Sequence, residues 1–585
     1  MGGAVRMILN KPDLLSPSLK GDVSISDTKD GGSNTTLRAA GSVPLIKERL
    51  AMNVVGSYAD SSGFIDNVAT GVEDFNSTTS SAIRSSVLAS FTDRLSAEFL
   101  YMRNDQEMDG FPYMDTQLPD LEVSILEPLT GDLVTDVAAL TFNWDLGFAG
   151  LTSVSSYFTF DRDSQLRFRL VGGFFRPFGP VTQEPLSIVA QLDSFSQEFR
   201  LVSSGDERLD WVIGLYYRDK EQDTRARWYI AESDLAAVNA GLAAAGRPLL
   251  PASGLALDRP FEDRYEQYAV YGEASFELTA ALEATLGLRW YDEETTAASA
   301  ATFYSYLAPA STPWTSNSVS DSGVVPKLSL SYKVSSDVML YATVAEGFRS
   351  ATVNPQAQLV GLGEVLVESD TLTNYEIGIK SQLLDDRATL NGSVFFADWK
   401  DIQSGLIGFS DLLNRPAGFV GNGPDGEIRG VELEVQLQAT EWLALAVSAG
   451  YNDSEVTKAA YDISAGQTLP NAPEVTASAS VDIQWPAIGT STAVVHFDVV
   501  YQDEQNTRFM TPALPDGAPL ESYALGNLRA GLDFGTWGID LFANNLWDER
   551  AELGVGQGTV TNFDYPTLRT VNRPRTIGLV VRAAY

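Results

Sequence analysis

The feature that constrains this chain most is an alternation of apolar and polar side chains with a period of two residues. Within 374–383, the apolar set is Tyr375, Ile377, Ile379 and Leu383, and the polar set is Asn374, Glu376, Lys380 and Gln382. A second run begins at Ala388 after the Asp385-Asp386 turn, and a third begins at Val431. Because side chains alternate across a β-strand, each run has one apolar face and one strongly polar face.

Many strands of this kind, joined alternately by tight turns and long polar loops, are typical of a membrane β-barrel with an apolar outside and a wet lumen. A bilayer permits such a sheet only if it closes, because a free edge would leave backbone groups unpaired in hydrocarbon. About 22 such runs follow one another, the size of barrels whose lumen is plugged. We therefore predict an all-β chain that forms a transmembrane antiparallel β-barrel of about 22 strands, with short periplasmic turns and long extracellular loops.

The lengths of the connections support this prediction. Short links fall near residues 92–93, 147–148, 204–206, 335–336, 385–386, 488–489 and 535–536. Long links fall near 106–133, 164–189, 224–262, 296–319, 349–369, 402–426, 454–471, 505–519 and 547–572. In the long link 224–262 we expect one helix, capped by Ser233 and stopped by Gly246 and Pro248, with Leu235, Val238 and Leu242 on one face.

Charge and composition narrow the possible partners. Lys and Arg number 40 and Asp and Glu 77, a formal net charge of −37, which argues against nucleic acid as a partner because phosphate binding needs basic patches. Acidic loops suit cations or neutral solutes. The acidity is equally explained by a need to keep the chain soluble and able to fold while it is in transit. The chain has no Cys, so it has no disulfide, thiolate metal site or Cys nucleophile, and we predict no cofactor.

The long links contain aromatic side chains next to arginines, which can stack on a planar ligand and pair with an anionic one. The candidate ligand-binding residues are Phe111, Tyr113, Phe174, Arg176, Trp228, Tyr229, Tyr306, Trp314, Phe348, Arg349 and Phe509. The alternative is that these side chains pack the loops together or belong to the aromatic girdle at the membrane interface. Asp109, Asp115 and Asp120 offer oxygen ligands for Ca²⁺, but without EF-hand spacing they are better explained as solvated loop charge.

The single histidine, His496, lies mid-strand, with Asp498 on the same, lumenal face and Val495 and Phe497 toward lipid. We interpret it as a hydrogen-bonding partner in the lumen, because one His without Cys does not make a transition-metal cage. We predict no metal site and no catalytic residue. A Ser–His hydrolase needs a His at the chemistry, and GxSxG, HExxH and P-loop motifs are absent from the sequence.

Five segments, in order, resemble motifs of the TonB-dependent outer-membrane receptor family. They are residues 341–349 (YATVAEGFR), 368–380 with the core NYEIGIK, 430–434 (GVELE), 544–548 (NNLWD) and 572–576 (NRPRT), which leads to the C-terminal Tyr585. The resemblance covers most of the chain. It implies an outer-membrane barrel of a Gram-negative bacterium, with a final aromatic residue associated with barrel insertion.

Residues 2–8 resemble the last strand of the family's plug domain, so we divide the chain into a plug remnant (1–12) and a receptor-type barrel (13–585). The rest of the plug and the TonB box that precede the barrel in family members are not found, and neither is a signal peptide. We therefore expect a mature form or a missing N-terminus, and the family's TonB complex would act through a plug missing from this chain.

The resemblance implies TonB-dependent uptake of a scarce solute, most often a ferric siderophore or similar iron complex, with outer-membrane lipid as the surrounding partner. The alternatives are a plug-less passive pore or truncated receptor fragment, an uptake receptor for an oligosaccharide or cobalamin, and a soluble all-β binding or adhesion module. An enzyme is not expected.

Overall fold

The computed structural model describes residues 8–127, 129–167, 175–205, 208–303, 311–354, 363–410, 415–512, 514–556 and 567–585. Twenty-two strands form one antiparallel sheet. In chain order they are β1 (Ser18–Thr28), β2 (Ser33–Ile46), β3 (Leu50–Ser61), β5 (Thr78–Thr92), β6 (Leu95–Met108), β9 (Thr130–Asp145), β10 (Ala149–Arg167), β11 (Pro185–Ser203), β12 (Leu209–Tyr229), β13 (Leu255–Glu277), β14 (Leu282–Phe303), β15 (Ser311–Lys333), β16 (Val338–Arg349), β19 (Asp370–Leu383), β20 (Ala388–Lys400), β23 (Asp425–Thr440), β24 (Leu443–Lys458), β25 (Val475–Pro486), β26 (Thr492–Gln502), β29 (Tyr523–Asp533), β30 (Trp537–Asn544) and β33 (Thr576–Ala584).

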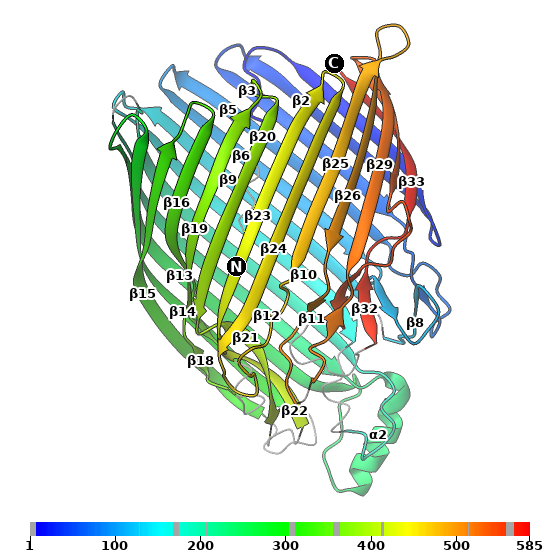
Figure 1. Cartoon of the computed structure of the whole chain (residues 1–585). Helices are drawn as coiled ribbons and strands as arrows, with labels where there is room; N and C mark the ends of the chain where they lie inside the picture. Colours follow the sequence, from blue (N-terminus) through cyan, green and yellow to red (C-terminus); the bar gives the residue numbers. More distant parts are fainter. Residues whose placement is uncertain are drawn as a thin grey trace.

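The sheet closes into a barrel because β1 pairs with β33 as well as with β2. Leu19 and Tyr585 exchange two backbone hydrogen bonds of 2.9 and 2.7 Å, which completes the seam at the short-turn end. Every barrel strand therefore has two neighbours, and the sheet has no free edge. The predicted closed antiparallel barrel is confirmed, with the short turns at one end and the long loops at the other (Figure 1).

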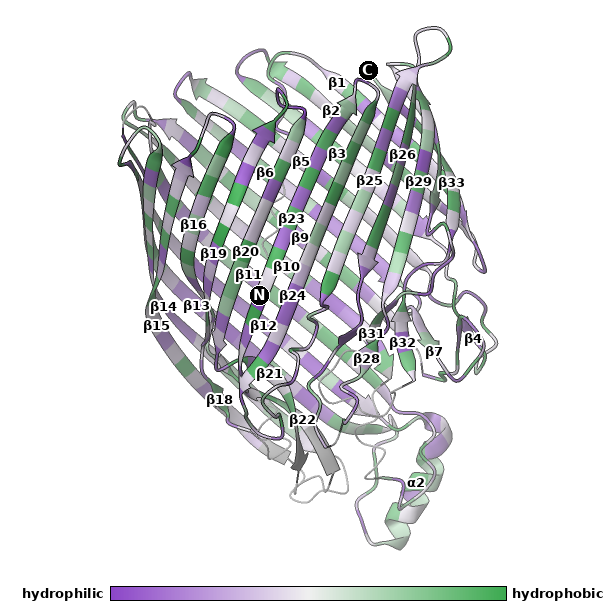
Figure 2. Cartoon of the chain, in the orientation of Figure 1, coloured by the Kyte–Doolittle hydropathy of each residue, from purple (hydrophilic) through white to green (hydrophobic). Residues whose placement is uncertain are grey.

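The three sequence runs that predicted the barrel lie in one register. Ile377 on β19 is opposite Val394 on β20, which is opposite Val431 on β23. All three side chains are exposed, Ile377 at 69%, so this row faces the lipid. The next row contains Gly378, Ser393 and Glu432 and therefore faces the lumen. The same alternation of hydropathy continues along the strands in Figure 2.

One side of the barrel is taller than the other. Strands β10 to β15 have 19 to 23 residues, whereas a tilted strand crosses a bilayer with about 9–11. We call these six strands the tall wall. Their loop ends extend beyond the sequence prediction, which placed residues 296–319 in a loop, whereas β14 runs to Phe303 and β15 begins at Ser311. That prediction was wrong because the extensions contain mainly Ala, Ser and Thr, which pair as strands without alternating in polarity.

Smaller elements fold over the long-loop end (Figure 1). They are β4 (Asp66–Asn67), β7 (Tyr113–Asp115), β8 (Glu122–Val123), α2 (Glu232–Ala244), β17 (Thr352–Val353), β18 (Leu366–Val367), β21 (Gln403–Ser410), β22 (Arg415–Asn422), β27 (Gln505–Asn506), β28 (Pro519–Leu520), β31 (Glu552–Val555) and β32 (Leu568–Val571). Among the described residues, no helix has the length and apolarity to cross a membrane.

Helix α2 confirms the predicted helix but not its cap. Ala231, not Ser233, is the N-cap, and no side chain caps it, because Ser233 already lies inside the first turn. The helix ends as predicted near Gly246, which adopts a positive φ of 65°. The Arg247 amide donates to the Leu242 carbonyl at 2.9 Å, the hydrogen bond of a Schellman motif, in which glycine readily adopts the left-handed conformation seen at Gly246.

The leading segment lies against the inside of the barrel. The side-chain amide of Asn53, on the lumenal face of β3, donates to the Asn10 carbonyl at 3.0 Å, and the Asp13 amide donates to the Ser42 hydroxyl at 2.9 Å. Residues 8–12 form no strand, and residues 1–7, which hold nearly all of the segment 2–8 that resembles a plug strand, lie outside the described residues.

Candidate functional site

Three clusters of buried apolar side chains organise the long loops. The α2 cluster comprises Phe175, Leu186, Trp228, Ile230, Val238, Leu242, Leu250, Ala256, Leu257 and Ala301. The hairpin cluster, which includes one residue each of β21 and β22, comprises Ile402, Leu406, Phe419, Val456, Ile463, Leu469 and Phe509. The β7–β32 cluster comprises Phe64, Ile65, Leu121, Val123, Ile125, Leu129, Leu568 and Val571. Because each cluster joins side chains from different segments, buried apolar contacts hold the long loops together at this end of the barrel.

Four predicted ligand residues lie in or against these clusters. Trp228 is only 6% exposed within the α2 cluster, and Phe509 is similarly buried within the hairpin cluster. Phe111 and Tyr113 stack with ring centroids 5.6 Å apart and pack against the β7–β32 cluster. Burial raises the pKa of the Tyr113 hydroxyl, with the Arg162 guanidinium opposing that rise. These placements favour the loop-packing interpretation over a ligand contact for Trp228 and Phe509.

Phe348 and Arg349 also make contacts within the protein. Phe348 stacks on Tyr291 of β14, with centroids 3.9 Å apart and planes 11° apart. Arg349 forms an ion pair with Asp370 and lies over the Trp399 ring, with its Cζ 5.1 Å from the centroid. The two residues therefore fix the β16 end of a loop to the barrel wall.

The remaining predicted residues are dispersed. Arg176 is exposed and lies 3.9 Å from the buried Glu184. Tyr229 ends β12, and Trp314, at 47% exposure, lies on the outer face of β15, since Thr315 beside it pairs with the lumenal Ser299. Phe174 and Tyr306 lie outside the described residues.

The inner face of the tall wall carries a set of arginines that the sequence analysis did not single out. Pairing register and side-chain alternation place five of them toward the lumen: Arg162, Arg200, Arg218, Arg259 and Arg289. Their hydrogen-bond partners within the described residues are neutral. Arg162 donates to Ser164 at 2.9 Å, Arg218 to Ser194 at 3.3 Å, and Arg289 to Gln267 at 3.2 Å. Arg200 Nε is buried without a hydrogen-bond partner.

Aromatic side chains share this inner face. Phe158 and Phe160 of β10 and Tyr265 of β13 are half-buried and point the same way as the arginines. A half-buried guanidinium beside an aromatic face can bind anionic oxygens and stack on a planar group. The inner face of the tall wall is therefore the part of the described structure whose chemistry best suits an anionic, partly aromatic solute.

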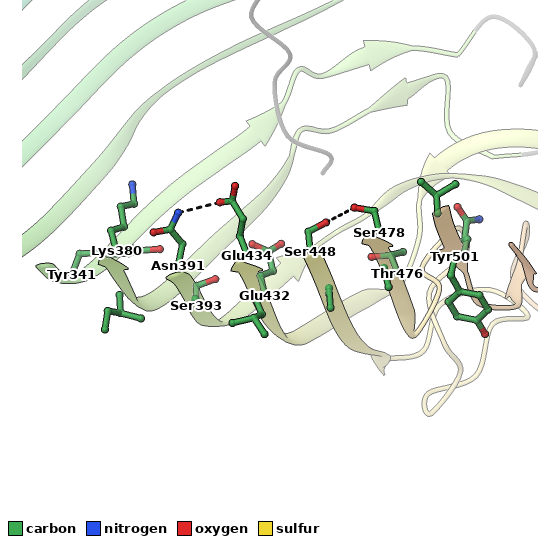
Figure 3. Close-up of a pocket in the computed structure, with 18 of the residues that line it drawn as sticks. Tyr341, Lys380, Asn391, Ser393, Glu432, Glu434, Ser448, Thr476, Ser478 and Tyr501 are labelled. Atoms are coloured by element: carbon green, nitrogen blue, oxygen red, sulfur yellow. Dashed lines mark hydrogen bonds between the residues drawn. The ribbon is translucent and has the colours of Figure 1, made fainter. Parts of the chain in front are cut away.

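The wall formed by strands β16 to β26 carries mainly small and polar side chains on its inner face. A hollow of about 750 Å³ lies along strands β16 to β26. Figure 3 shows Lys380, Asn391, Glu434, Ser448 and Ser478 on one side of the sheet, with Tyr501 pointing to the other side. Asn391 donates to Glu434 at 3.0 Å, and the Ser448 and Ser478 hydroxyls lie 2.7 Å apart. Small side chains such as Ser448 and Gly450 leave this part of the lumen wide and polar.

His496 lies on the lumenal face of β26, as predicted, within the same wall. Its Nδ1 is 2.7 Å from Asp482 and its Nε2 is 3.3 Å from Asp498. In the described part of the chain, no group of three or more His, Asp or Glu side chains is arranged to hold a metal ion.

The TonB-dependent receptor-like β-barrel family matches residues 67–546, most of the chain. This chain belongs to the TonB-dependent receptor family. A relative by sequence is the pesticin receptor of Yersinia pestis, 25% identical over 399 residues, which are 66% of this chain and 51% of that protein. The pesticin receptor of Yersinia enterocolitica is 25% identical over 293 residues, 49% of this chain and 37% of that protein.

Solved structures share the receptor fold. The ferric yersiniabactin uptake receptor FyuA from Yersinia pestis superposes with a TM-score of 0.80 at 17% identity, covering 98% of this chain and 81% of that one. The siderophore receptor PiuA from Acinetobacter baumannii gives a TM-score of 0.71 at 16% identity, covering 97% and 82%. The receptor barrel described here is thus an outer-membrane protein, and its family and fold are those of receptors and transporters.

The sequence analysis missed the tall-wall arginines for a definable reason. It searched for arginine beside aromatics in the long links, whereas Arg200, Arg218 and Arg289 lie within strands, where a lumenal arginine is ordinary. Only the strand register shows that these three arginines have no carboxylate partner among the described residues. The available signal was the repeated appearance of Arg at lumenal positions of consecutive strands.

Proposed function

We propose that this receptor barrel serves TonB-dependent uptake of a ferric siderophore or a similar iron complex. The observation that carries the proposal is the family match over most of the chain, together with relatives whose names include a ferric yersiniabactin uptake receptor and a siderophore receptor. The chain covers about half or less of the length of its curated sequence relatives, so the activity and partners of the whole receptor remain part of this proposal.

In the proposed mechanism, the long loops capture the ligand at the barrel mouth and the inner face of the tall wall holds it. The wide polar wall opposite, from β16 to β26, leaves space for the ligand to move. The energy for passage would come from the TonB complex, acting through a plug domain inside the barrel. The chain supplies binding and a path, and we propose no enzymatic turnover of the ligand.

Binding to the detergent-purified protein tests this proposal directly. Ferric yersiniabactin, a ferric catecholate and ferric citrate are titrated in turn while intrinsic tryptophan fluorescence is recorded. We expect at least one complex to quench saturably, with a Kd in the micromolar range or tighter, and its iron-free form to bind more weakly. The absence of saturable binding for all three complexes, alongside binding of an oligosaccharide or cobalamin, would replace iron uptake by uptake of that solute.

The passive-pore alternative makes a different prediction. The wide hollow beside Ser448 and Gly450 favours it if no plug fills the lumen. In planar bilayers, a pore would show stable conductance steps without any ligand. A barrel with a closed lumen would remain silent.

A further inference from the structure

The loop between β16 and β19 begins and ends against the inner face of the tall wall. Its two described ends, residues 350–354 and 365–369, pair with each other through β17 and β18. We call these residues the loop base. Ala351, Val353 and Val367 are 5%, 6% and 0% exposed, so the loop base is packed against the protein and does not project into the medium.

Two lumenal side chains of β14 hold the first end of the loop base. The Ser350 hydroxyl donates to Glu293 at 3.1 Å. The Thr295 hydroxyl donates to the Ala351 carbonyl at 3.0 Å. Glu293 and Thr295 are 3% and 5% exposed, whereas Glu294, which lies between them on the outer face, is exposed. A charged outer face indicates that this level of the wall lies beyond the hydrocarbon, where water and protons reach the barrel mouth.

An acid on the next strand holds the other end of the loop base. Asp321 on β15 is directly opposite Glu293, and it accepts a hydrogen bond from the Ser369 hydroxyl. Ser350 and Ser369 are the first and last residues of the loop. Each end of the loop therefore donates to one member of a cross-strand pair of carboxyl groups.

The two carboxyl groups receive only neutral hydrogen-bond donors from the described residues. Side chains directly opposite each other in an antiparallel sheet have Cβ atoms about 4.5–5.5 Å apart, and like charges at such positions are destabilising. Nothing in the hydrogen bonding offsets that repulsion with a positive charge. The donors are Tyr265, Gln267 and Ser350 for Glu293, and Tyr291 and Ser369 for Asp321.

Each carboxyl group uses only one of its oxygens in these bonds. All three donors to Glu293 reach Oε2, and Oε1 is buried without a hydrogen-bond partner among the described residues. Both donors to Asp321 likewise reach Oδ2. A buried acceptor without a donor is unfavourable. A proton held between the two carboxyl groups would satisfy this oxygen and remove one of the two negative charges.

The charged groups around the pair do not neutralise it. Each surrounding arginine is bound elsewhere, Arg289 of β14 to Gln267, Arg218 of β12 to Ser194 and Arg349 of β16 to Asp370. The tyrosines, Tyr265 and Tyr291, are donors to the pair. Two further acids add negative charge, Glu346 of β16, whose charge acts on Tyr291, and the exposed Glu368 of the loop base. These surroundings favour a bound proton over a second negative charge.

We propose that Glu293 and Asp321 share one proton and act as a latch that holds the loop base on the inner face of the tall wall. With the proton bound, Ser350 and Ser369 donate to a pair that carries a single negative charge. Without it, two negative charges face each other and the buried Glu293 oxygen stays unsatisfied, so the loop base is released more easily. The latch needs no ligand, and it is therefore independent of the proposed function.

Docking of the loop base should weaken as the pH rises. Carboxyl groups released into water are ionised above about pH 5, whereas the docked pair holds a proton under this proposal. Docking is then coupled to proton uptake, and its stabilisation is lost as the shared proton leaves. Release would uncover the inner face of β14 at Glu293 and Thr295, so the pH would control access to this part of the barrel mouth.

The test uses the purified full chain, which has no Cys, with a nitroxide label at L366C. Leu366 is a loop-base residue with 45% exposure. Spectra are recorded between pH 5 and pH 8 in the presence of EDTA, which excludes an effect of bound metal ions. E293Q and D321N each neutralise one member of the pair and keep a hydrogen-bonding side chain. D292N is the matched control, because Asp292 is an exposed acid next to Glu293 on the outer face.

We expect the mobile fraction of the label to rise roughly threefold or more from pH 5 to pH 8 in the L366C chain and in its D292N variant. In E293Q and in D321N the label should stay immobile, with less than about a 1.5-fold change. The latch would be overturned by a mobile fraction that is constant or falls as the pH rises, by an unchanged pH response in both variants, or by a label already mobile at pH 5 in both. If one variant does not fold, the other decides.

Discussion

Arg349 at the end of β16 and Asp370 at the start of β19 are opposite each other and form an ion pair at the base of the loop that connects their strands. Arg349 Nε donates to Asp370 Oδ2 at 2.8 Å, and Arg349 Nη2 donates to the Gln403 carbonyl at 2.8 Å. The backbone amide of Gln403 in turn donates to Asp370 Oδ2 at 3.0 Å. One ion pair therefore fastens the base of the loop between β16 and β19, and Gln403 after β20, to the barrel rim.

Replacing Arg349 with Met should loosen both loops together. Asp370 is 2% exposed, so its carboxylate would keep only the Gln403 amide as a donor, at a cost of about 1–3 kcal/mol in local stability. Amide hydrogen exchange in residues 350–354 and 403–406 would report the opening. The matched control is Arg38→Met, whose partner Asp22 is more accessible and whose loss should cost about 1 kcal/mol or less. Unchanged exchange at Gln403 would show that the pair does not fasten the second loop.

Substitution of Trp228 and of Trp314 distinguishes a role in loop packing from a role in ligand contact. Trp228 is 6% exposed in the α2 cluster, and Trp314 is 47% exposed on the outer face of β15. Trp228→Ala should destabilise the α2 loop by about 3–5 kcal/mol because it leaves a cavity, whereas Trp314→Ala should change stability by about 0.5 kcal/mol or less. Limited proteolysis around α2 measures both. A Trp228→Ala protein with an intact α2 loop but lost ligand binding would reverse the assignment made here.

The contrast between Trp228 and Trp314 shows which structural features a sequence pattern can predict and which it cannot. Alternation along one strand indicates its two faces, and so residues such as Ile377 and Val394 were enough to predict a closed barrel. Burial of Trp228 depends on a helix that packs against β11, β13 and β14, and no local pattern records that packing. The contact of Arg289 with Gln267 depends on register, because the two residues lie on the neighbouring strands β14 and β13. Pairwise contacts of this kind are set by tertiary structure.

Asp548 should make the loop after β30 sensitive to acid. Burial alone would raise the pKa of Asp548, but hydrogen bonds from Arg550, Lys29 and the Arg575 amide hold that pKa well below its ordinary value. A lowered folded-state pKa adds stability that is complete above the unfolded value of about 3.9 and is lost as the pH falls toward the folded value. The loop should therefore stay ordered at neutral pH and loosen progressively below about pH 4.

The absence of Cys in the chain allows a single spin label to measure this effect. A label at L553C, in the exposed part of β31, should become more mobile as the pH is lowered from 7 to 3. With D548N added, the label should already be more mobile at pH 7 and should respond less to acid. A label that loosens equally in both backgrounds would assign the acid response to other carboxylates.

An arginine introduced on the lipid face of the sheet should cost more stability than one introduced on the lumenal face. Ile377 is 69% exposed in the row that faces lipid, whereas Ser448 lines the lumenal hollow of about 750 Å³. Arg in place of Ile377 should cost about 2–4 kcal/mol if the residue lies near the bilayer midplane, because the guanidinium must enter hydrocarbon. Arg in place of Ser448 stays in water and should cost about 1 kcal/mol or less. Denaturant unfolding from lipid vesicles gives both values, and a larger cost for Ser448→Arg than for Ile377→Arg would mean that the lumen and lipid faces are assigned the wrong way round.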